Sequence, residues 1–272
     1  MPPELNQART RWIYALRIQS RVITALMLRE MKTRYGRQRL GYLWAIIEPI
    51  MFVVVLAAIF SIRGRGEAWD MPLVPFLVTG IIPYIMFRDL MGVGLQAVRS
   101  NQPLLTFPQI SLFDLLFARA LLETATHFLV FVILVVVITN LISPLRIDEP
   151  LLILVWMILT ALIGFGAGLG LGALAAVFRT VEQLAPTLIS RPLFFISGVF
   201  FTVDMIPEGV RDIALLNPLL HLIELLRSAF FVGYDSIYAS KVYAVFFVLS
   251  VLSLGLLTLS ALRKQILCAP RN

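Results

Sequence analysis

Apolar residues in this chain form long unbroken stretches and do not alternate with polar ones. Crossing a bilayer as a helix takes about 20 mostly apolar residues, and six stretches approach that length. Three contain no Asp, Glu, Lys or Arg, and a single charge or one adjacent charged pair interrupts the others. The pattern predicts six membrane-spanning helices, over Leu40–Ile62, Met71–Val98, Thr124–Leu145, Pro150–Phe178, Gln183–Val203 and Val242–Leu262.

The N-terminal arm ahead of the first span has an amphipathic pattern over residues 21–35. Met27 and Tyr35 fall on one helical face, and Arg29 and Lys32 fall opposite, although Glu30 and Arg34 interrupt the pattern. This arrangement is typical of a helix that lies in the cytoplasmic interface of a membrane. The alternative is a basic anchor without further function.

The connection between spans two and three, Arg99–Asp114, carries few charges and contains Pro103 and Pro108 among apolar residues. Exposed apolar residues indicate a surface that docks onto a partner. The alternative is a loop that folds back onto the helices of its own chain.

The segment Asp204–Ser236 contains two apolar stretches that are each too short to span a bilayer. Asn217 and Pro218 separate them and form a turn signal. We expect two short re-entrant helices, which are tolerated where protein or a water-filled cavity surrounds them. Two helices lying flat as a lid remain the alternative.

Composition supports the same class of protein. Hydrophobic residues make up 59% of the 272 residues, only 14% are charged, and the mean hydropathy is +0.89. A soluble domain does not have this composition, so the sequence predicts an all-α polytopic membrane protein. The single cysteine, Cys268, excludes an internal disulfide. Residues 1–39 contain no apolar core of signal-peptide type.

Basic residues predict the orientation. Residues 1–39 hold nine of them against Glu4 and Glu30, and the positive-inside rule places this arm in the cytoplasm. Anionic lipid accounts for the net charge of +7, so no nucleic-acid partner is inferred. We expect one domain: the arm (1–39), spans one to five (40–203), the outer segment (204–237), span six (238–262) and a cytoplasmic tail (263–272).

Catalytic motifs are missing from the sequence. It contains no phosphate-binding G-x-x-x-x-G-K-[ST] loop, no His-Glu-x-x-His, no cysteine cluster and no G-x-S-x-G elbow. The two histidines, His127 and His221, are predicted on opposite sides of the membrane. We therefore expect no cofactor, no metal and no ATP hydrolysis on this chain, which disfavours a lipid-modifying enzyme.

Glu48 and Pro49 interrupt the first predicted span. A carboxylate near a bilayer centre costs roughly 2.5–3.5 kcal/mol on insertion scales, so Glu48 should face protein or water. It either lines a hydrated passage or pairs with a basic residue of another span, for which Arg119 and Arg191 are candidates. A packing role alone is the alternative.

Glycines recur along the fourth span in two sets of small-xxx-small spacing, which lets helices approach closely. The partner helix belongs either to the same chain or to a second copy. The sequence shows no internal repeat, so a transporter built from two repeated halves has no support. The sets are Gly164, Gly168 and Gly172, and Gly166 and Gly170.

Five stretches in this order carry a resemblance to a known family. They are RYGRQRLGYLWAIIEP, NQPLLTFPQISLFDLLFARALLE, FRTVEQLAP, SGVFFTVDMIPEGVRDIALLNPL and IELLRSAFFVGY. Together they resemble the transmembrane permease subunits of bacterial ABC exporters of capsular polysaccharide, the KpsM-type permeases. The resemblance extends from about Arg21 to the last span.

The resemblance implies a homodimer in the inner membrane that works with two copies of a separate ATPase, which binds ATP and Mg. It implies a channel between the two copies, and periplasmic and outer-membrane partners that carry the cargo onward. The implied cargo is a lipid-linked, usually acidic polysaccharide. O-antigen, teichoic acid or a lipophilic drug are alternative cargoes.

The resemblance also assigns roles to segments. The expected ATPase-coupling residues are Gln102, Pro103, Leu104, Leu105, Thr106, Phe107 and Pro108. The expected periplasmic gate residues are Asn217, Pro218, His221, Glu224 and Arg227. From their chemistry and position, and not from the resemblance, we expect the glycolipid path to include Arg37, Arg39, Tyr42, Trp44, Glu48, Arg119 and Glu123. The alternatives are ordinary positive-inside anchors for Arg37 and Arg39 and lipid-facing or core positions for the aromatic residues.

Overall fold

The computed structural model of the protein describes residues 3–35, 43–62, 67–68, 71–100, 111–142 and 144–268, and most of these residues are helical. A short antiparallel hairpin pairs β1 (Glu67–Ala68) with β2 (Met71–Pro72). The all-α class predicted from the sequence is confirmed. The helices are α1 (Pro3–Tyr35), α2 (Leu43–Ile62), α3 (Leu73–Ser100), α4 (Leu112–Leu141), α5 (Pro150–Val177), α6 (Arg179–Ala185), the π-helical turn η2 (Pro186–Ser190), α7 (Arg191–Ile196), the 3₁₀ turn η3 (Val203–Met205), α8 (Glu208–Ala214), α9 (Pro218–Phe230) and α10 (Lys241–Cys268).

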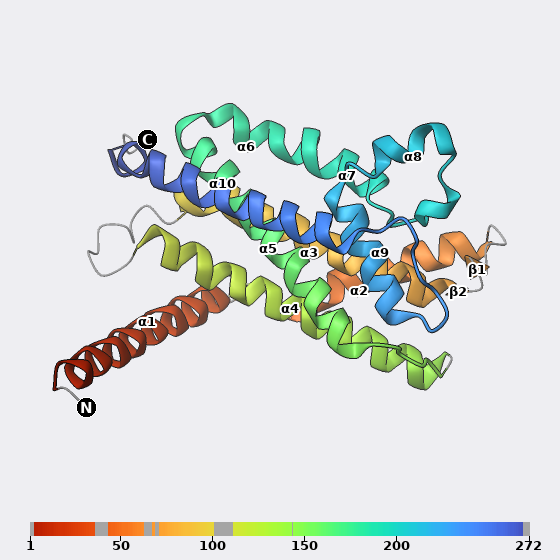
Figure 1. Ribbon diagram of the computed structural model, residues 1–272, viewed down its shortest axis with the longest axis horizontal. Coiled ribbons are helices and arrows are strands. Elements are labelled where there is room, and N and C mark those ends of the chain that lie inside the picture. Colours follow the sequence, from red (N-terminus) through yellow and green to blue (C-terminus); the bar gives the residue numbers. More distant parts are fainter. Residues whose placement is uncertain are drawn as a thin grey trace.

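The long helices run back and forth along the longest axis of the molecule (Figure 1). α2 and α4 lead away from the end that carries α1, and α3, α5 and α10 return toward it. The hairpin and α8 lie at the opposite end. We refer to these as the α1 end and the α8 end. The start of α1 and the end of α10 both lie at the α1 end (Figure 1).

Five helices are long and apolar enough to cross a membrane: α2, α3, α4, α5 and α10. They correspond to predicted spans one to four and six. The third begins at Leu112, well before the predicted Thr124, because helix α4 starts at its cap and not where its apolar run starts. Ser111 Oγ accepts from the Asp114 backbone N–H at 3.0 Å, and the Asp114 carboxylate accepts from the Ser111 N–H at 3.2 Å, which is a capping box.

The fifth predicted span, Gln183–Val203, is shorter and less regular than expected. α6, η2 and α7 form one continuous helical rod over residues 179–196, which runs from the α1 end toward the α8 end (Figure 1). Pro186 opens the π turn, where its ring removes a backbone donor. Gly198, with φ of +74°, follows the end of α7 and turns the chain back before Val203.

α3 forms the centre of the bundle, and α2 and α10 form its periphery. Of the span windows, 83% of that in α3 is buried inside the chain, against 11% in α2 and 17% in α10. The exposed residues of α2 are nevertheless strongly apolar, and they include Val54, Val55 and Ile59. Apolar side chains on the outside and a buried central helix are the arrangement expected of a protein with lipid around it.

One glycine set of α5 faces α3 of the same chain. A Cβ added at Gly164 would lie 2.9 Å from the Phe87 carbonyl oxygen, and one added at Gly168 would lie 2.7 Å from the Leu90 carbonyl oxygen. Gly172 meets the backbone of Gly94 in the same way. The two backbones therefore touch directly along this seam.

The other glycine set faces α10. A Cβ added at Gly166 would lie 2.7 Å from the Leu252 Cα, and one added at Gly170 would lie 3.4 Å from the Gly255 Cα. α5 is therefore held between α3 and α10. This resolves the question left open by the sequence, because the partners of both glycine sets lie within the chain.

α9 is enclosed by the bundle, whereas α8 is exposed at its end. The axis bends by 100° between the two helices. Eleven residues of α9, including Glu224 and Arg227, are buried, while Val210 and Ile213 of α8 are exposed. Whether the two helices enter the membrane as re-entrant segments stays a prediction.

Arg227 joins α9 to the turn after α7 and to α3. Its guanidinium donates to the carbonyl oxygens of Phe201 at 2.9 Å and Val199 at 3.1 Å, and it lies 3.9 Å from the Phe76 ring centroid. Glu224 supplies the opposite charge at 3.4 Å. Both side chains are fully buried, so these contacts offset the desolvation of the two ions.

Tyr234 completes this buried network from the segment after α9. Its hydroxyl donates to Glu224 Oε2 at 2.5 Å. Burial raises the pKa of the Tyr234 phenol, and the nearby Glu224 charge raises it further. The phenol therefore stays protonated and remains a hydrogen-bond donor to the carboxylate.

The glycine seam predicts that Gly168→Ala destabilises the protein. The added methyl meets the backbone of α3, which cannot rotate away, and overpacking of this kind costs about 1–3 kcal/mol. Gly92→Ala is the matched control, because an added Cβ there meets nothing within 4 Å. We expect a lower unfolding temperature in detergent for Gly168→Ala only. An equal effect of the two variants would contradict the seam.

The Arg227 network predicts a larger loss for Arg227→Met, which leaves Glu224 buried without its counter-charge. Breaking a buried ion pair costs about 3–5 kcal/mol. Lys241→Met, which removes an exposed charge at the start of α10, is the control. Adding Glu224→Gln to Arg227→Met should recover part of the lost thermal stability. No recovery in the double variant would show that the backbone contacts of Arg227 dominate.

Candidate functional site

Two polar cavities lie between the helices toward the α1 end. The larger, of about 690 Å³, we call the basic cavity; its charged lining residues are Arg29, Glu30, Arg88, Asp89, Arg119 and Arg191. The smaller, of about 330 Å³, we call the acidic cavity; its polar lining residues are Glu48, Arg88, Asp89, Glu123, Thr126 and His127. Arg88 and Asp89 of α3 line both.

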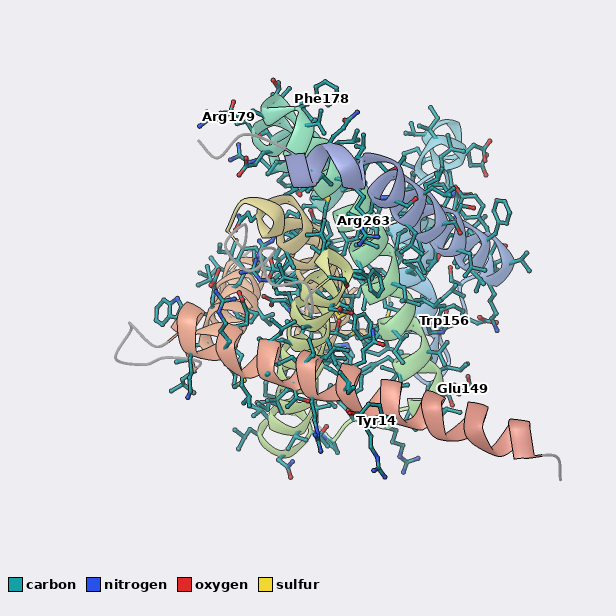
Figure 2. The ribbon with its side chains drawn as sticks, turned by 90° about the vertical axis from the view of Figure 1, so that its left-hand side faces the viewer. Tyr14, Glu149, Trp156, Phe178, Arg179 and Arg263 are labelled. Atoms are coloured by element: carbon teal, nitrogen blue, oxygen red, sulfur yellow. The ribbon has the colours of Figure 1, made fainter. Side chains whose placement is uncertain are left out.

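The charged lining residues of the basic cavity come from four helical elements. α1 supplies Arg29 and Glu30, α3 supplies Arg88 and Asp89, α4 supplies Arg119, and α7 begins at Arg191. Figure 2, which looks onto the α1 end, shows α1 crossing this end of the bundle.

Two of its arginines are held by carboxylates. Arg119 pairs with Glu30 at 2.6 Å, which fixes α1 to α4. Arg88 pairs with Asp89 at 2.8 Å, through both Nε and a terminal nitrogen. With four guanidinium groups and two carboxylates in its lining, the cavity has a surplus of two positive charges.

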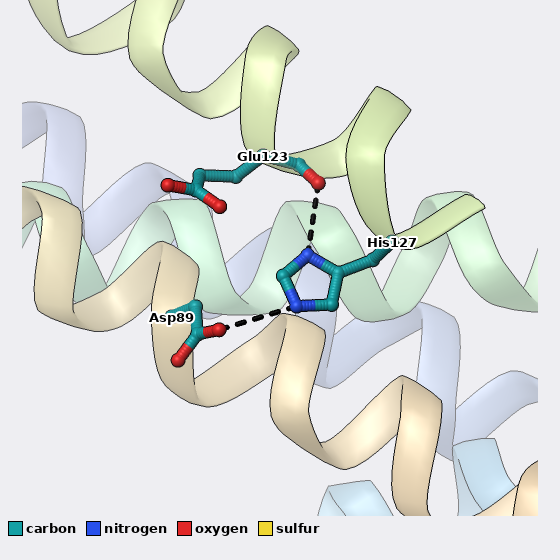
Figure 3. A group of neighbouring side chains, drawn as sticks. All are labelled: Asp89, Glu123 and His127. Atoms are coloured by element: carbon teal, nitrogen blue, oxygen red, sulfur yellow. Dashed lines mark hydrogen bonds and ion pairs between the residues drawn. The ribbon is translucent and has the colours of Figure 1, made fainter. Parts of the chain in front are cut away.

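The acidic cavity contains a tight cluster of Asp89, Glu123 and His127 (Figure 3). His127 Nε2 lies 3.2 Å from Asp89 Oδ2, and its Nδ1 lies 2.9 Å from the Glu123 carbonyl oxygen. One donor atom from each side chain fits within 4.8 Å of the others.

These three side chains are of the types that bind Zn²⁺ or Mn²⁺, but Arg88 makes a resident metal a poor fit. Its guanidinium already neutralises Asp89 at 2.8 Å. Both ring nitrogens of His127 are also engaged, Nε2 by the Asp89 carboxylate at 3.2 Å and Nδ1 by the Glu123 carbonyl oxygen at 2.9 Å. The geometry favours a cluster of paired side chains that joins α3 to α4 over a metal centre.

Glu48 opens onto the acidic cavity from α2. Among the residues the structure describes, it pairs with neither Arg119 nor Arg191. Arg119 is paired with Glu30 instead, and Arg191 lines the other cavity. The expectation of an ion pair across spans is therefore wrong for both arginines, and the expectation that Glu48 faces a polar space agrees with the structure. Pro49 lies inside a continuous α2 and is buried.

The predicted interface helix exists, but it begins at Pro3 and packs on α4. Leu26 and its partly buried neighbour Met27 contact Leu115 and Ala118. Arg29 lines the basic cavity, and Lys32 is exposed. Tyr35 is the last residue of the helix, and its side chain lies outside the described residues.

Several predicted site residues fall in segments that the structure does not describe. These are the path residues Arg37, Arg39 and Tyr42 and the whole coupling set, Gln102, Pro103, Leu104, Leu105, Thr106, Phe107 and Pro108. Trp44 is exposed at the start of α2. The coupling role therefore stays a prediction from the sequence.

The predicted gate residues hold α9 in place. Asn217 Oδ1 caps the helix by accepting from the Leu219 N–H at 3.0 Å, and Pro218 follows as its first residue. His221 Nδ1 accepts from the Ser240 N–H at 3.1 Å. With Glu224 and Arg227 in the buried network, all five belong to one connected region. Its role as a gate is not tested by this geometry.

Sequence reasoning missed the residues that divide the two cavities. In the sequence, Arg88 and Asp89 are recognisable only as a charged pair that interrupts the second span. Glu30 is recognisable only as an acidic residue that interrupts the amphipathic pattern of the arm. The signal was present in both cases, because a charge that breaks an apolar or basic pattern in a membrane protein is costly and requires a partner.

The chain matches the family model of the ABC-2 type transporter over residues 21–231. It is 35% identical to the polysialic acid transport protein KpsM of Escherichia coli over 240 residues, which cover 88% of this chain and 92% of that protein. It is 30% identical to the capsule polysaccharide export inner-membrane protein CtrC of Neisseria meningitidis, over 95% of this chain and 97% of the relative.

The capsule polysaccharide export inner-membrane protein BexB of Haemophilus influenzae is similar to the same extent, with 30% identity over 95% of this chain and 97% of its own length. The family match over residues 21–231 contains all the residues of both cavities, and it contains Glu224 and Arg227 of the buried network. The alignments extend over nearly the whole length of each relative, so the similarity concerns the architecture and not one motif. The chain is a member of the ABC-2 type transporter family.

Proposed function

We propose that the chain is the membrane-spanning subunit of an ATP-driven exporter that moves lipid-linked capsular polysaccharide across the inner membrane. The observation that carries this proposal is the near full-length similarity to three proteins, of which two are named for capsule polysaccharide export and one for polysialic acid transport. The many apolar helices of the chain are consistent with it.

The two cavities would lie on the cytoplasmic side in this function. The nine basic residues of the arm place the α1 end there by the positive-inside rule. A substrate made in the cytoplasm would then meet the basic cavity first. α8, α9 and the hairpin would face the periplasm, where further export components take over the polymer.

Energy for export must come from outside the chain, because its sequence contains no phosphate-binding loop. We infer two copies of a separate ABC ATPase, which binds ATP and Mg, and a second copy of this chain. The residues 102–108 between α3 and α4 are the expected contact with the ATPase. The polymer would pass between the two copies.

Deletion of the gene tests this function in the native cell. We expect the capsule to be lost from the cell surface and polysaccharide with its lipid terminus to accumulate in the cytoplasm. Immunoblots of surface and cell extracts measure both pools, and wild-type complementation is the control. An intact capsule with loss of O-antigen, teichoic acid or drug resistance would assign one of the alternative cargoes instead.

The coupling segment predicts that Leu105→Ala with Phe107→Ala separates the chain from its ATPase. Burying one such side chain contributes about 1.5–3 kcal/mol, so two truncations weaken docking without unfolding the spans. The protein should reach the membrane at the normal level but lose co-purification of the ATPase. Leu254→Ala with Leu257→Ala, which truncates exposed residues of α10, is the control. Unchanged co-purification in the first variant would move the contact to another surface.

A further inference from the structure

We propose that the basic cavity is the binding site for an oxyanion, a phosphate or carboxylate, at the lipid-linked end of the cargo. The identity of the cargo rests on the proposed function, but the anion chemistry follows from the lining of the cavity. Its volume, about 690 Å³, lies within the range of pockets that enclose a small-molecule ligand. It therefore has room for a phosphodiester group and neighbouring sugar atoms.

Charge is the first reason for an anionic ligand. Four arginines line the cavity, and its two carboxylates, Glu30 and Asp89, leave a surplus of two positive charges. Clefts with one sign of charge and low-dielectric walls concentrate ligands of the opposite sign. Arg88 and Asp89 form the wall shared with the acidic cavity, and their opposite charges cancel. The two surplus positive charges therefore come from residues that line the basic cavity alone.

Preorganisation is the second reason. Glu30 holds Arg119 at 2.6 Å, and Asp89 holds Arg88 at 2.8 Å. His127 in turn fixes Asp89 from the other side at 3.2 Å. A guanidinium has five N–H donors, so a carboxylate that takes one or two of them orients the group and leaves others for a ligand. Arginines held in this way match the planar, two-point geometry of phosphate and carboxylate.

Arg191 is the residue that we expect to contribute most to binding. It opens α7 directly after the π turn, and its side chain is exposed within the cavity lining. Within the described residues no ion pair engages it. Its charge is therefore available to a ligand at little cost to the rest of the fold.

The same helical rod has an apolar outer side that suits a lipid-borne ligand. Leu184 and Leu188 are exposed on it, with exposed fractions of 46% and 64%, while Pro186 and Ser190 line the cavity. An anionic headgroup could therefore enter between α1 and the rod while its acyl chains stay in the bilayer. A soluble glycan acid would use the same arginines without needing this outer side.

Binding to the purified full-length chain in dodecyl maltoside tests the proposal. The probes are dodecyl phosphate, dodecyl phosphocholine with the same chain but no net charge, and soluble trigalacturonate. We expect dodecyl phosphate to bind and high salt to weaken it. Arg191→Gln should weaken it at least about tenfold, since hydrogen bonds to charged groups contribute this much. Arg191→Lys should give an intermediate affinity, because it keeps the charge and loses the two-point geometry.

Arg179→Gln is the matched control, because Arg179 is exposed on the same rod but does not line the cavity (Figure 2). It should bind dodecyl phosphate like wild type. Equal affinity of wild type, Arg191→Gln and Arg29→Gln would overturn the proposed site, whatever the export phenotype. Binding of trigalacturonate but not of dodecyl phosphate would assign the anion to the glycan and not to the lipid end.

The export function and the anion site are tested independently, so either one can be wrong while the other holds. If deletion of the gene leaves the capsule intact while Arg191→Gln still loses the anion, the cavity is an oxyanion site of a transporter with another cargo. If deletion abolishes the capsule while Arg191→Gln binds normally, the export function stands and the headgroup is bound elsewhere. Unfolding temperatures of each variant, expected to equal that of wild type, show that a loss of binding is local.

Discussion

Direct contact between helix backbones is the constraint on which this structure depends. Lipid removes most of the hydrophobic driving force between helices, so association relies on close van der Waals contact. α5 achieves it on two sides, where Gly164 and Gly168 touch α3 and Gly166 touches α10. With these three helices fixed, α4 and the rod of α6 and α7 take the remaining positions around α3. The cavities are spaces that the side chains of those outer elements and of α3 leave unfilled.

Arg227 and Asp89, two charged residues inside the bundle, are both compensated by groups from their own helix and from a neighbouring element. Arg227 is matched by Glu224 and by the carbonyls after α7. Asp89 is matched by Arg88 and by His127 of α4. Removing a single partner from such a set leaves an ion in a low-dielectric interior, which costs more than the pair contributes. These sets therefore fix the register of the helices that they join.

The sequence was sufficient to predict the helical class, five of the spans and the existence of α1, α8 and α9. Apolar length alone decides whether a helix can cross a bilayer, so these features do not depend on tertiary contacts. Boundaries were less certain, because α4 begins at a capping box and not at its first apolar run. The end of α7 depends on Gly198, whose left-handed backbone no hydropathy pattern reveals.

The site was harder to predict than the spans, because pairings between distant helices leave no local pattern. From the sequence, Arg119 is a candidate partner of Glu48, whereas the structure joins it to Glu30, far away in α1. Asp89 and His127 were never connected, since nothing in the sequence places α3 against α4 in one register. The charges themselves are visible in the sequence, but the packing of α1 and α3 against α4 determines which of them meet.

The same packing limits where a polymer could cross. The glycine contacts bring α5 so close to α3 and α10 that no sugar ring fits between these three helices. A path for polysaccharide must therefore run along elements outside this core. α2 is such an element: little of it is buried within the chain, and it borders the acidic cavity through Glu48. The exposed face of α2 needs a second surface opposite it to enclose a hydrated path. The second copy of the chain inferred in the proposed function would supply that surface by symmetry. Close packing within the subunit is thus the physical reason to expect the channel between subunits.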